Sequence, residues 1–242
     1  MNVRDACFRE NLYSLVECGT KCQKENFQFI EENVFAMGFD YVSYGIKMPI
    51  PLTKFRAIMI SNYPDAWQAR YDQADYIQID PVVLKGLKTI GEQINWTDSL
   101  FSNARQFWEE AQSYGIKYGL SRSSRLGSTI GMLSASRHNT SISPEELAHI
   151  QDKFYWLAQV AHITLSHVLS ENIPERNVIL TKREIEVLKW TADGKSAYDI
   201  SMIFGVSKNT IDFHIKNCIA KLNTTNKVAA TVKAVSLGLL ST

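Results

Sequence analysis

The residues best suited to bind a small molecule lie between positions 61 and 83, in the stretch SNYPDAWQARYDQADYIQIDPVV. Tyr63, Trp67 and Tyr71 recur at four-residue intervals, so in a helix they would share one face and form an apolar wall with polar tips. Asp80 follows them and would supply a buried hydrogen-bond acceptor. Such a set suits a neutral ligand with one N–H donor and several carbonyl acceptors, held in an otherwise apolar cavity.

The same residues also fit a purely structural role. Aromatic stripes at helical spacing usually belong to a hydrophobic core. Asp80 precedes Pro81, and this pair is also typical of a helix N-cap followed by proline in the first turn. On the residue pattern alone, the structural and the ligand-binding interpretations both remain open.

A second candidate site lies near the C-terminus, where capping residues and glycines divide the chain into helices. The capping residues are Thr181 with Glu184, Ser196 with Asp199, and Ser207, and the glycines are Gly194 and Gly205. A short helix, a turn containing glycine and a longer helix follow one another, which predicts a helix-turn-helix.

The longer helix, which begins at Lys208, could place a polar face in the major groove of DNA. Its apolar side would comprise Ile211, Ile215, Cys218 and Leu222. We predict base contacts by Asn209 and Lys216, because an amide can bond adenine at two atoms and a cation can reach guanine acceptors, while Asp212 would accept from cytosine. The phosphate contacts are assigned to Lys189, Lys195, Lys208, Thr210 and Lys221. A merely solvated helix face is the alternative, but the caps, the turn and the local basicity agree on DNA binding.

Composition indicates a folded protein whose basic residues are concentrated near the C-terminus. The 242 residues are 45% hydrophobic, and residues 174–242 hold ten Lys and Arg against six Asp and Glu, whereas residues 1–173 hold sixteen against nineteen. No run approaches the roughly 18 consecutive apolar residues of a membrane span, so we expect no membrane partner and a cytoplasmic location. The cysteines and histidines match no zinc or haem spacing, so no metal and no cofactor are expected.

Two domains are predicted, joined by the polar, proline-containing stretch SENIPERN. We place a ligand-binding domain at residues 1–170, a linker at 171–178 and a DNA-binding domain at 179–242. Helical spacing at 24–37, 105–114 and 142–169 and strand-like runs at 41–48, 55–61 and 129–136 predict an α+β first domain, an α/β/α sandwich. The second domain is predicted to be all-α, with four helices. Residues 121–131 are expected to form a connection at the rim of the pocket.

The C-terminal segment resembles the LuxR-type helix-turn-helix of bacterial regulators. The residues that carry this resemblance are Glu184, Leu188, Gly194, Thr210, His214, Lys221 and Leu222. The first domain resembles the autoinducer-binding domain of LuxR-family quorum-sensing receptors through Trp67, Tyr71, Asp80, Pro81, Trp96 and Gly115. The two matches span nearly the whole chain and are nearest to the SdiA-like and QscR-like receptors, which often lack a paired synthase.

The resemblance implies that the ligand is an N-acyl-homoserine lactone. Trp67 would donate its indole N–H to the lactone carbonyl, Asp80 would accept the amide N–H, and Tyr63 and Ser134 would bond the acyl carbonyl. The remaining pocket residues would be Tyr71 and Trp96, as walls, and Ser43 and Met59, which would set chain length or read a 3-oxo group. An empty pocket would leave Trp67, Asp80 and Tyr63 without partners, so ligand binding and folding are expected to be coupled.

The implied function is a ligand-responsive transcription factor of quorum sensing that binds pseudo-palindromic, double-stranded promoter DNA as a homodimer, with RNA polymerase as a further partner. Candidate dimer surfaces are the apolar stripes of residues 142–169 and of the final helix, unless these stripes pack within their own protomer. The alternative is a ligand-independent regulator whose first domain is a dimerisation scaffold; a cavity lined by Trp67, Asp80 and Ser134 would distinguish the two. An enzyme is not expected, because no activated nucleophile or metal spacing is visible.

Overall fold

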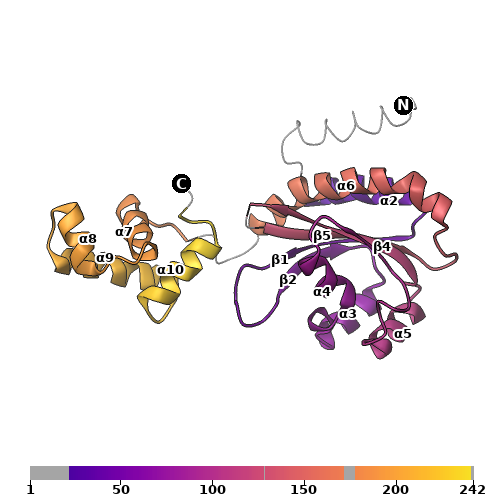
Figure 1. Cartoon of the computed structure of the whole chain (residues 1–242), viewed down its shortest axis with the longest axis horizontal. Helices are drawn as coiled ribbons and strands as arrows, with labels where there is room; N and C mark the ends of the chain where they lie inside the picture. Colours follow the sequence, from indigo (N-terminus) through magenta and orange to yellow (C-terminus); the bar gives the residue numbers. More distant parts are fainter. Residues whose placement is uncertain (1–21, 128, 172–177, 241–242) are drawn as a thin grey trace, which may run out of the picture. The chain divides into compact units, whose positions relative to one another are not determined.

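The computed structural model describes residues 22–127, 129–171 and 178–240. The chain divides into two compact units between Leu169 and Ser170. The first unit combines helices with a sheet, and the described part of the second is helical (Figure 1). Residues 172–177, which make up most of the predicted linker, lie outside the described residues. Within the described ranges, no helix is long and apolar enough to cross a membrane.

One antiparallel sheet organises the first unit. Its strands are β1 (Tyr41–Lys47), β2 (Ala57–Ser61), β3 (Gln93–Asn95), β4 (Tyr118–Leu126) and β5 (Thr129–Arg137), in the spatial order β2-β1-β5-β4-β3. Successive side chains of a strand point to opposite faces, and residues paired across neighbouring strands share a face. The register therefore decides which side chains meet on each face.

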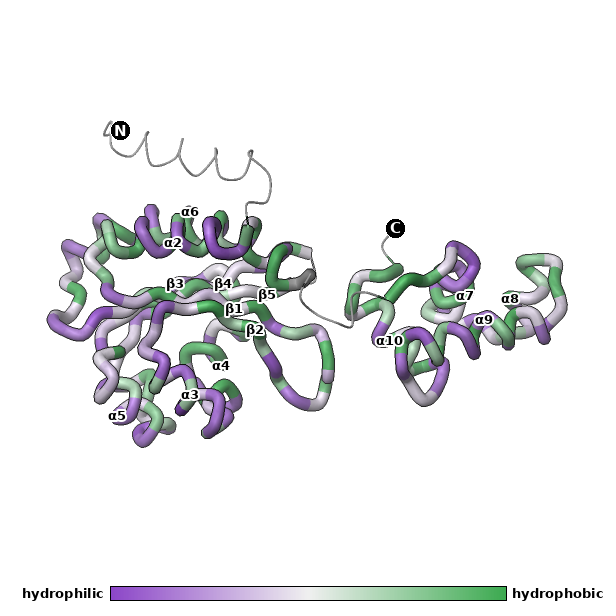
Figure 2. Tube along the Cα trace, turned by 180° about the vertical axis from the view of Figure 1, so that it is seen from behind, coloured by the Kyte–Doolittle hydropathy of each residue, from purple (hydrophilic) through white to green (hydrophobic). Residues whose placement is uncertain are grey.

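One face of the sheet packs against α2 (Gln23–Ala36) and α6 (Pro144–Glu171) (Figure 1). Along α6 the hydropathy alternates with each turn, so one side of the helix can be buried and the other left in water (Figure 2). The buried side chains of this core include Ile30 and Val34 of α2, Val42, Tyr44 and Ile46 of β1, Leu133 of β5, and Phe154, Leu157 and Leu165 of α6.

A buried polar pair lies within this core. The Tyr44 hydroxyl is 2.7 Å from His162 Nδ1, and the other ring nitrogen of His162 lies 3.3 Å from the Thr129 carbonyl oxygen. These contacts give buried polar atoms the partners that they need away from water. Gly131 makes room for the pair, because a β-carbon at this position would overlap the Tyr44 hydroxyl and the His162 ring.

The opposite face of the sheet carries α3 (Asp65–Gln73), the 3-10 turn η1 (Tyr76–Gln78), α4 (Pro81–Lys88) and α5 (Arg105–Ser113) (Figure 1). This layer is rich in aromatic residues. The buried members of its cluster include Tyr63, Trp67, Tyr71, Tyr76, Phe101, Phe107 and Trp108. Helices on both faces complete an α/β/α arrangement, so the predicted fold class of the first unit is confirmed.

The second unit contains α7 (Lys182–Ala192), α8 (Ala197–Phe204), α9 (Lys208–Lys221) and α10 (Lys227–Ser236). The predicted helix starts and stops are present. Capping boxes form at Thr181 with Glu184 and at Ser196 with Asp199, Gly205 ends α8 at a φ of 66°, and Ser207 accepts the Thr210 N–H at the start of α9. Ile211, Ile215, Cys218 and Leu222 are all buried, so the predicted apolar side of α9 is confirmed.

One sequence prediction about the fold is wrong. Residues 121–131, expected to be a connection, mostly belong to the hairpin of β4 and β5. The segment SRSS, residues 121–124, was not predicted to be a strand. Its buried positions on the pocket face of the sheet are serines, whereas the strand pattern expects apolar residues there. The short strand β3 was also not predicted.

Gly131→Ala should destabilise the protein, because the added methyl group would push Tyr44 and His162 apart in a filled core. We expect a loss of about 1–3 kcal/mol in the free energy of unfolding. Gly45→Ala is the matched control on the neighbouring strand, where the new β-carbon would lie 3.6 Å from the Ile58 carbonyl oxygen and 3.9 Å from Met59, which is ordinary contact. Urea unfolding followed by tryptophan fluorescence measures both variants, and equal midpoints for the two would contradict this assignment.

Candidate ligand pocket and DNA-binding helix

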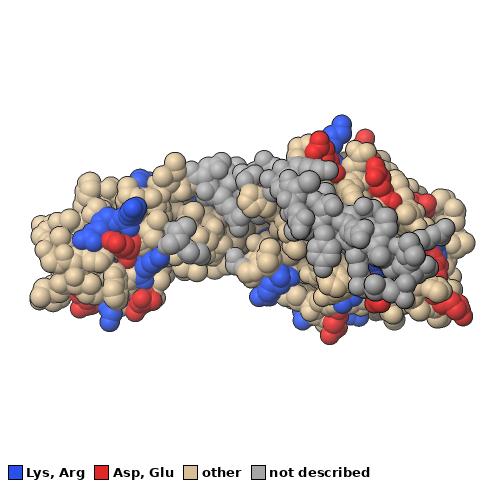
Figure 3. Space-filling model, turned by 90° about the horizontal axis from the view of Figure 1, so that it is seen from above, with Lys and Arg blue, Asp and Glu red and all other residues tan. Residues whose placement is uncertain are grey.

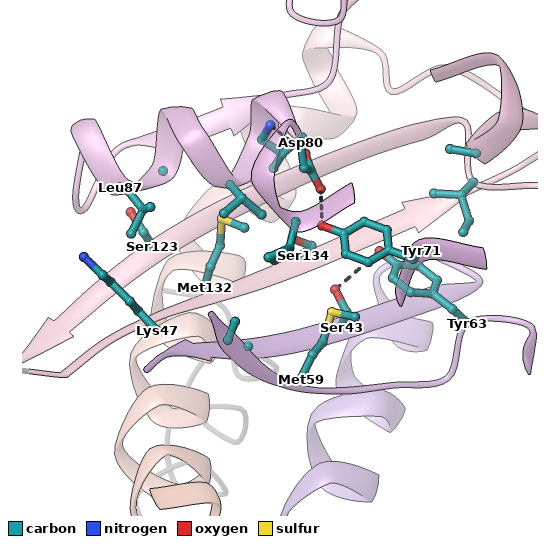
Figure 4. A pocket seen from close by; sticks show the side chains of 18 of the residues that line it. Ser43, Lys47, Met59, Tyr63, Tyr71, Asp80, Leu87, Ser123, Met132 and Ser134 are labelled. Carbon is teal, nitrogen blue, oxygen red and sulfur yellow. Dashed lines mark hydrogen bonds between the residues drawn. The ribbon is translucent and has the colours of Figure 1, made fainter. Parts of the chain in front are cut away.

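A pocket lies between the second face of the sheet and the layer of α3, α4 and α5 (Figure 4). Its floor is built from rows of residues that are paired across strands. One row consists of hydroxyl groups, with Ser43 on β1, Ser134 on β5 and Ser121 on β4. The next row consists of Met59, Gly45, Met132 and Ser123. The pocket therefore has a polar end at the serine row and a largely apolar end beyond it.

Tyr63, Trp67 and Tyr71 all line this pocket and are buried, but they do not share one helix. The helix α3 begins at Asp65, so Tyr63 precedes it. The expectation that all three residues share one helix face is therefore wrong. Tyr63 directly precedes Pro64, and a residue before proline is disfavoured in the helical conformation. The three rings converge by tertiary packing rather than by helical periodicity alone.

Asp80 caps α4, as the structural interpretation predicts, and its side chain also lines the pocket. One carboxylate oxygen accepts the Val82 backbone N–H at 2.8 Å and caps α4, and the other accepts the Tyr71 hydroxyl at 2.9 Å (Figure 4). The side chain is 9% exposed and lines the pocket. Burial raises the pKa of Asp80 to about 6, and the hydrogen bonds from Tyr71 and the α4 backbone oppose this rise.

A relay of hydrogen bonds orients the serine row. The Trp96 indole N–H donates to Ser121 Oγ at 2.9 Å, and Ser121 Oγ donates to Ser134 Oγ at 2.7 Å. Because Ser134 accepts in this relay, its own hydroxyl proton remains for another acceptor. Ser43 Oγ donates to the Tyr63 hydroxyl at 3.4 Å, and burial raises the pKa of Tyr63 to about 12, so this phenol keeps its proton as a donor.

Trp67 is a buried residue of the pocket whose indole N–H could serve a ligand. Among the described residues no acceptor contacts its indole N–H, although the ring is 3% exposed and packs edge-on against Tyr71. We expected Trp67, Asp80 and Tyr63 all to lack partners in an empty pocket. This expectation is wrong for Asp80, which bonds Tyr71, and for Tyr63, which bonds Ser43.

Further pocket residues, which we did not assign to the site, come from α5 and from the segments directly before and after it. They are Phe101, Phe107, Trp108, Ala111 and Ile116. The helical spacing of residues 105–114 predicted a buried face, and this face is the pocket wall. Arg70 of α3 binds Glu110 of α5, with 2.7 Å between Nε and Oε2, and so ties two walls of the pocket together.

The predicted DNA-binding residues lie on the surface of the second unit. Asn209, Thr210 and Lys216 are exposed on α9. Lys208 and Asp212 are bonded to each other at 2.7 Å, one helical turn apart. Asp212 therefore orients Lys208 at the start of the helix, where the backbone N–H groups also favour an anion.

Lys221, which is also assigned to a phosphate contact, has a structural partner. Its ammonium group lies 2.7 Å from Glu184 Oε2, and the Glu184 side chain is 3% exposed and also caps α7. Lys189 and Lys195 are exposed. Figure 3 shows one face of the molecule, on which basic side chains of the helical unit stand beside acidic ones. Any DNA contact on that face must therefore depend on particular residues more than on bulk charge.

A buried pocket with a polar end in one unit, and an exposed helix-turn-helix face in the other, define a ligand-binding transcriptional regulator. The chain belongs to the LuxR family: residues 23–165 match the autoinducer binding domain and residues 178–234 match the bacterial regulatory proteins, luxR family. The predicted family and the predicted function, regulation of transcription by an autoinducer-binding, DNA-binding protein of quorum sensing, are confirmed.

Several known proteins are similar over nearly their whole length. The transcriptional activator protein AnoR of Acinetobacter nosocomialis is 36% identical over 225 residues, which cover 91% of this chain and 94% of AnoR. The crystal structure of Escherichia coli SdiA has a TM-score of 0.86 and 30% identity, over 97% of this chain and 98% of that chain. A structure of SdiA in complex with octanoyl-rac-glycerol has a TM-score of 0.85 and 30% identity, over 99% and 98% of the two chains. The predicted likeness to SdiA is confirmed, and the likeness to QscR stays a prediction.

Asp80→Asn should stabilise the ligand-free protein at neutral pH. Asparagine can still accept from Val82 and contact the Tyr71 hydroxyl, but it carries no buried charge. Because folding raises the pKa of Asp80 from 3.8 to about 6, the stabilising contribution of its protonated form is lost as the pH rises through about 6. We expect the variant to gain about 2–3 kcal/mol at pH 7.5 and nothing near pH 4.

Urea unfolding at the two pH values measures this difference. Asp72→Asn, on the exposed side of α3, serves as the control and should change little at either pH. A variant at Asp80 that is less stable than the wild type at pH 7.5 would show that the charge is favourable in the empty pocket.

Proposed function

We propose that the pocket binds an N-acyl-homoserine lactone and that the bound ligand stabilises the DNA-binding form of a homodimer. The observation that carries this proposal is the arrangement of one acceptor and several donors at one end of an apolar pocket. Asp80 offers the acceptor, and Trp67, Tyr63 and Ser134 offer donors. A lactone with one amide N–H and two carbonyl oxygens has the complementary set.

Each polar group of the proposed ligand has a residue suited to it. The unpaired Trp67 indole N–H would bond the lactone carbonyl, and Asp80 would accept the amide N–H in addition to its bonds with Tyr71 and Val82. The Tyr63 and Ser134 hydroxyls would bond the acyl carbonyl. Tyr71 and Trp96 would wall the ligand, and Ser43 and Met59 would lie along the acyl channel, as all four side chains line the pocket.

The alternative, a ligand-independent regulator with a scaffold domain, is disfavoured by the pocket itself. A domain that served only to dimerise would be expected to fill this space with side chains, since protein interiors are close-packed. Instead, Trp67, Asp80 and Ser134 surround a cavity. The octanoyl chain named for the SdiA complex, in a fold of TM-score 0.85, supports an eight-carbon chain as a ligand of suitable size.

Adding a six- to eight-carbon acyl-homoserine lactone should raise the thermal stability and the soluble yield of the protein. Burying the chain contributes about 0.8 kcal/mol per methylene, and a hundredfold excess over the Kd should raise the unfolding temperature by roughly 5–10 °C. Differential scanning fluorimetry measures the shift, with homoserine lactone lacking the acyl chain as the matched control. Trp67→Phe should reduce the shift because it keeps the ring and loses the N–H. Identical unfolding temperatures with and without ligand would refute the proposal.

Pairing of two copies would follow from the two-fold symmetry of the DNA site that we propose. Val228, Val232 and Val235 of α10 are 63%, 39% and 53% exposed, so this stripe does not pack within its own unit and is free to meet a second copy. Leu239 instead packs against the core of its own unit. On α6, Trp156 and Ile163 remain 40% and 43% exposed on the side away from the sheet.

RNA polymerase would be a further partner, in the cytoplasm where the promoter lies. A protein partner needs a surface that the DNA-reading residues do not occupy. The helical unit exposes Tyr198 and Met202 of α8 and Phe213 of α9, at 60%, 67% and 60% of their surfaces. Large exposed apolar side chains in one small unit are typical of a protein interaction surface.

Asn209→Ala should weaken binding to the preferred DNA site by about 1–3 kcal/mol and relax the choice of base at one position. Lys195→Ala should weaken binding to all sequences alike and lower the dependence on salt by about one counterion. Both can be measured with duplexes selected from a random library by the full-length, lactone-treated protein. If the alanine at position 209 lowered affinity equally for all sequences, Asn209 would be a phosphate contact instead.

A further inference from the structure

Ser123 of β4 stands out in the second row of the pocket floor. Of the four residues in this row, Met59, Gly45, Met132 and Ser123, it alone carries a hydroxyl group. Its side chain is 1% exposed and lines the pocket, next to Leu87 and Met132 (Figure 4). Among the described residues its Oγ has no hydrogen-bond partner. A buried hydroxyl without a partner is unfavourable unless a ligand or water supplies one.

We propose that Ser123 donates a hydrogen bond to an oxygen atom on the acyl chain of the ligand, so that the pocket selects an oxygenated chain over a plain one. This inference rests on the proposed lactone-binding function and adds the chemical class of the acyl group. A site built to bond an oxygen rejects an analogue that lacks it, because the buried partner is then left unpaired.

The strand register sets where on the chain this oxygen lies. Ser123 is two residues along β4 from Ser121, a distance of about 7 Å, and Ser121 is hydrogen-bonded to Ser134. Ser134 is the proposed partner of the acyl carbonyl. An extended chain advances roughly 1.2 Å per bond, and each hydrogen bond itself spans about 2.8 Å. The oxygen that Ser123 reaches therefore lies between about the third and the sixth carbon of the acyl chain.

The residues first expected to read such an oxygen are less suitable. Ser43 Oγ is already bonded to the Tyr63 hydroxyl, and Met59 offers only a thioether sulfur, which is a weak acceptor and no donor. Ser61 and Ser136 also have buried hydroxyls without partners among the described residues, but neither lines the pocket. Ser123 combines an unpaired donor with a position on the path of the chain.

The alternative is that position 123 requires only a small side chain and makes no use of the hydroxyl group. The helix α4 lies close to β4 here, and a β-carbon added at Gly86 would lie 3.7 Å from the Ser123 β-carbon. A small residue at position 123 could therefore serve only to admit the helix. Alanine is equally small, so Ser123→Ala removes the hydroxyl and keeps the space.

The test measures the Kd of the full-length protein for lactones of equal chain length, one plain and the others with a carbonyl or hydroxyl oxygen at the third, fifth or sixth carbon. We expect the wild type to prefer at least one oxygenated lactone over the plain one by about three- to tenfold. Ser123→Ala should abolish this preference and leave affinity for the plain lactone unchanged or higher. Ser61→Ala, which removes an unpaired hydroxyl outside the pocket, should keep the preference.

The outcomes separate this inference from the function on which it rests. A wild type that binds none of the lactones would refute the proposed function. A wild type that binds them with no preference for an oxygenated chain, or a Ser123→Ala variant that retains the wild-type preference, would overturn the role of Ser123 alone. Thermal unfolding of both alanine variants, expected to equal or exceed that of the wild type, verifies that each is folded.

Discussion

The buried carboxylate of Asp80 is the interaction on which the ligand-binding unit depends. One oxygen starts α4 by accepting the Val82 N–H, and the other holds Tyr71 of α3. Two helices of the pocket wall are thus positioned by a group that also faces the cavity. Burial makes its charge unfavourable and raises its pKa to about 6. The same charge makes it a strong acceptor for an N–H group, which is the role that we propose for it toward the ligand.

This balance explains why a regulator would contain a pocket with buried polar groups that lack hydrogen-bond partners. In the described structure the buried Ser123 hydroxyl lacks a protein partner, and Asp80 holds its charge away from water. A ligand that meets these groups would remove several unfavourable terms at once and add the burial of its own chain. The gain would appear only in the folded, occupied state. Occupancy would then raise the folded population without any separate moving part.

Local signals in the sequence were sufficient for the helical unit but not for the pocket. The capping boxes at Thr181 and Ser196 are set by residues three positions apart, so they could be predicted directly. The serine row depends on the register of β1, β5 and β4, which joins positions about 90 residues apart along the chain. The strand β4 was not predicted because Ser121 and Ser123, its buried residues on the pocket face of the sheet, are serines rather than apolar residues. Likewise, Tyr63 lies beside Trp67 through packing, whereas the sequence spacing suggested one helix.

The residues that carry the family resemblance form two groups. Some hold the fold together, and others surround the polar end of the pocket. In the helical unit Glu184 and Lys221 bind each other and Leu188 and Leu222 are buried, so these positions hold the scaffold together rather than choose a DNA sequence. In the pocket, Trp67, Asp80 and Trp96 surround the polar end, where a constant head group would lie. The row beyond it, with Met132 and Ser123, carries none of the resemblance. Membership of the family therefore specifies an autoinducer as the class of ligand. In the function that we propose, the choice among acyl chains would fall to the second row of the pocket floor.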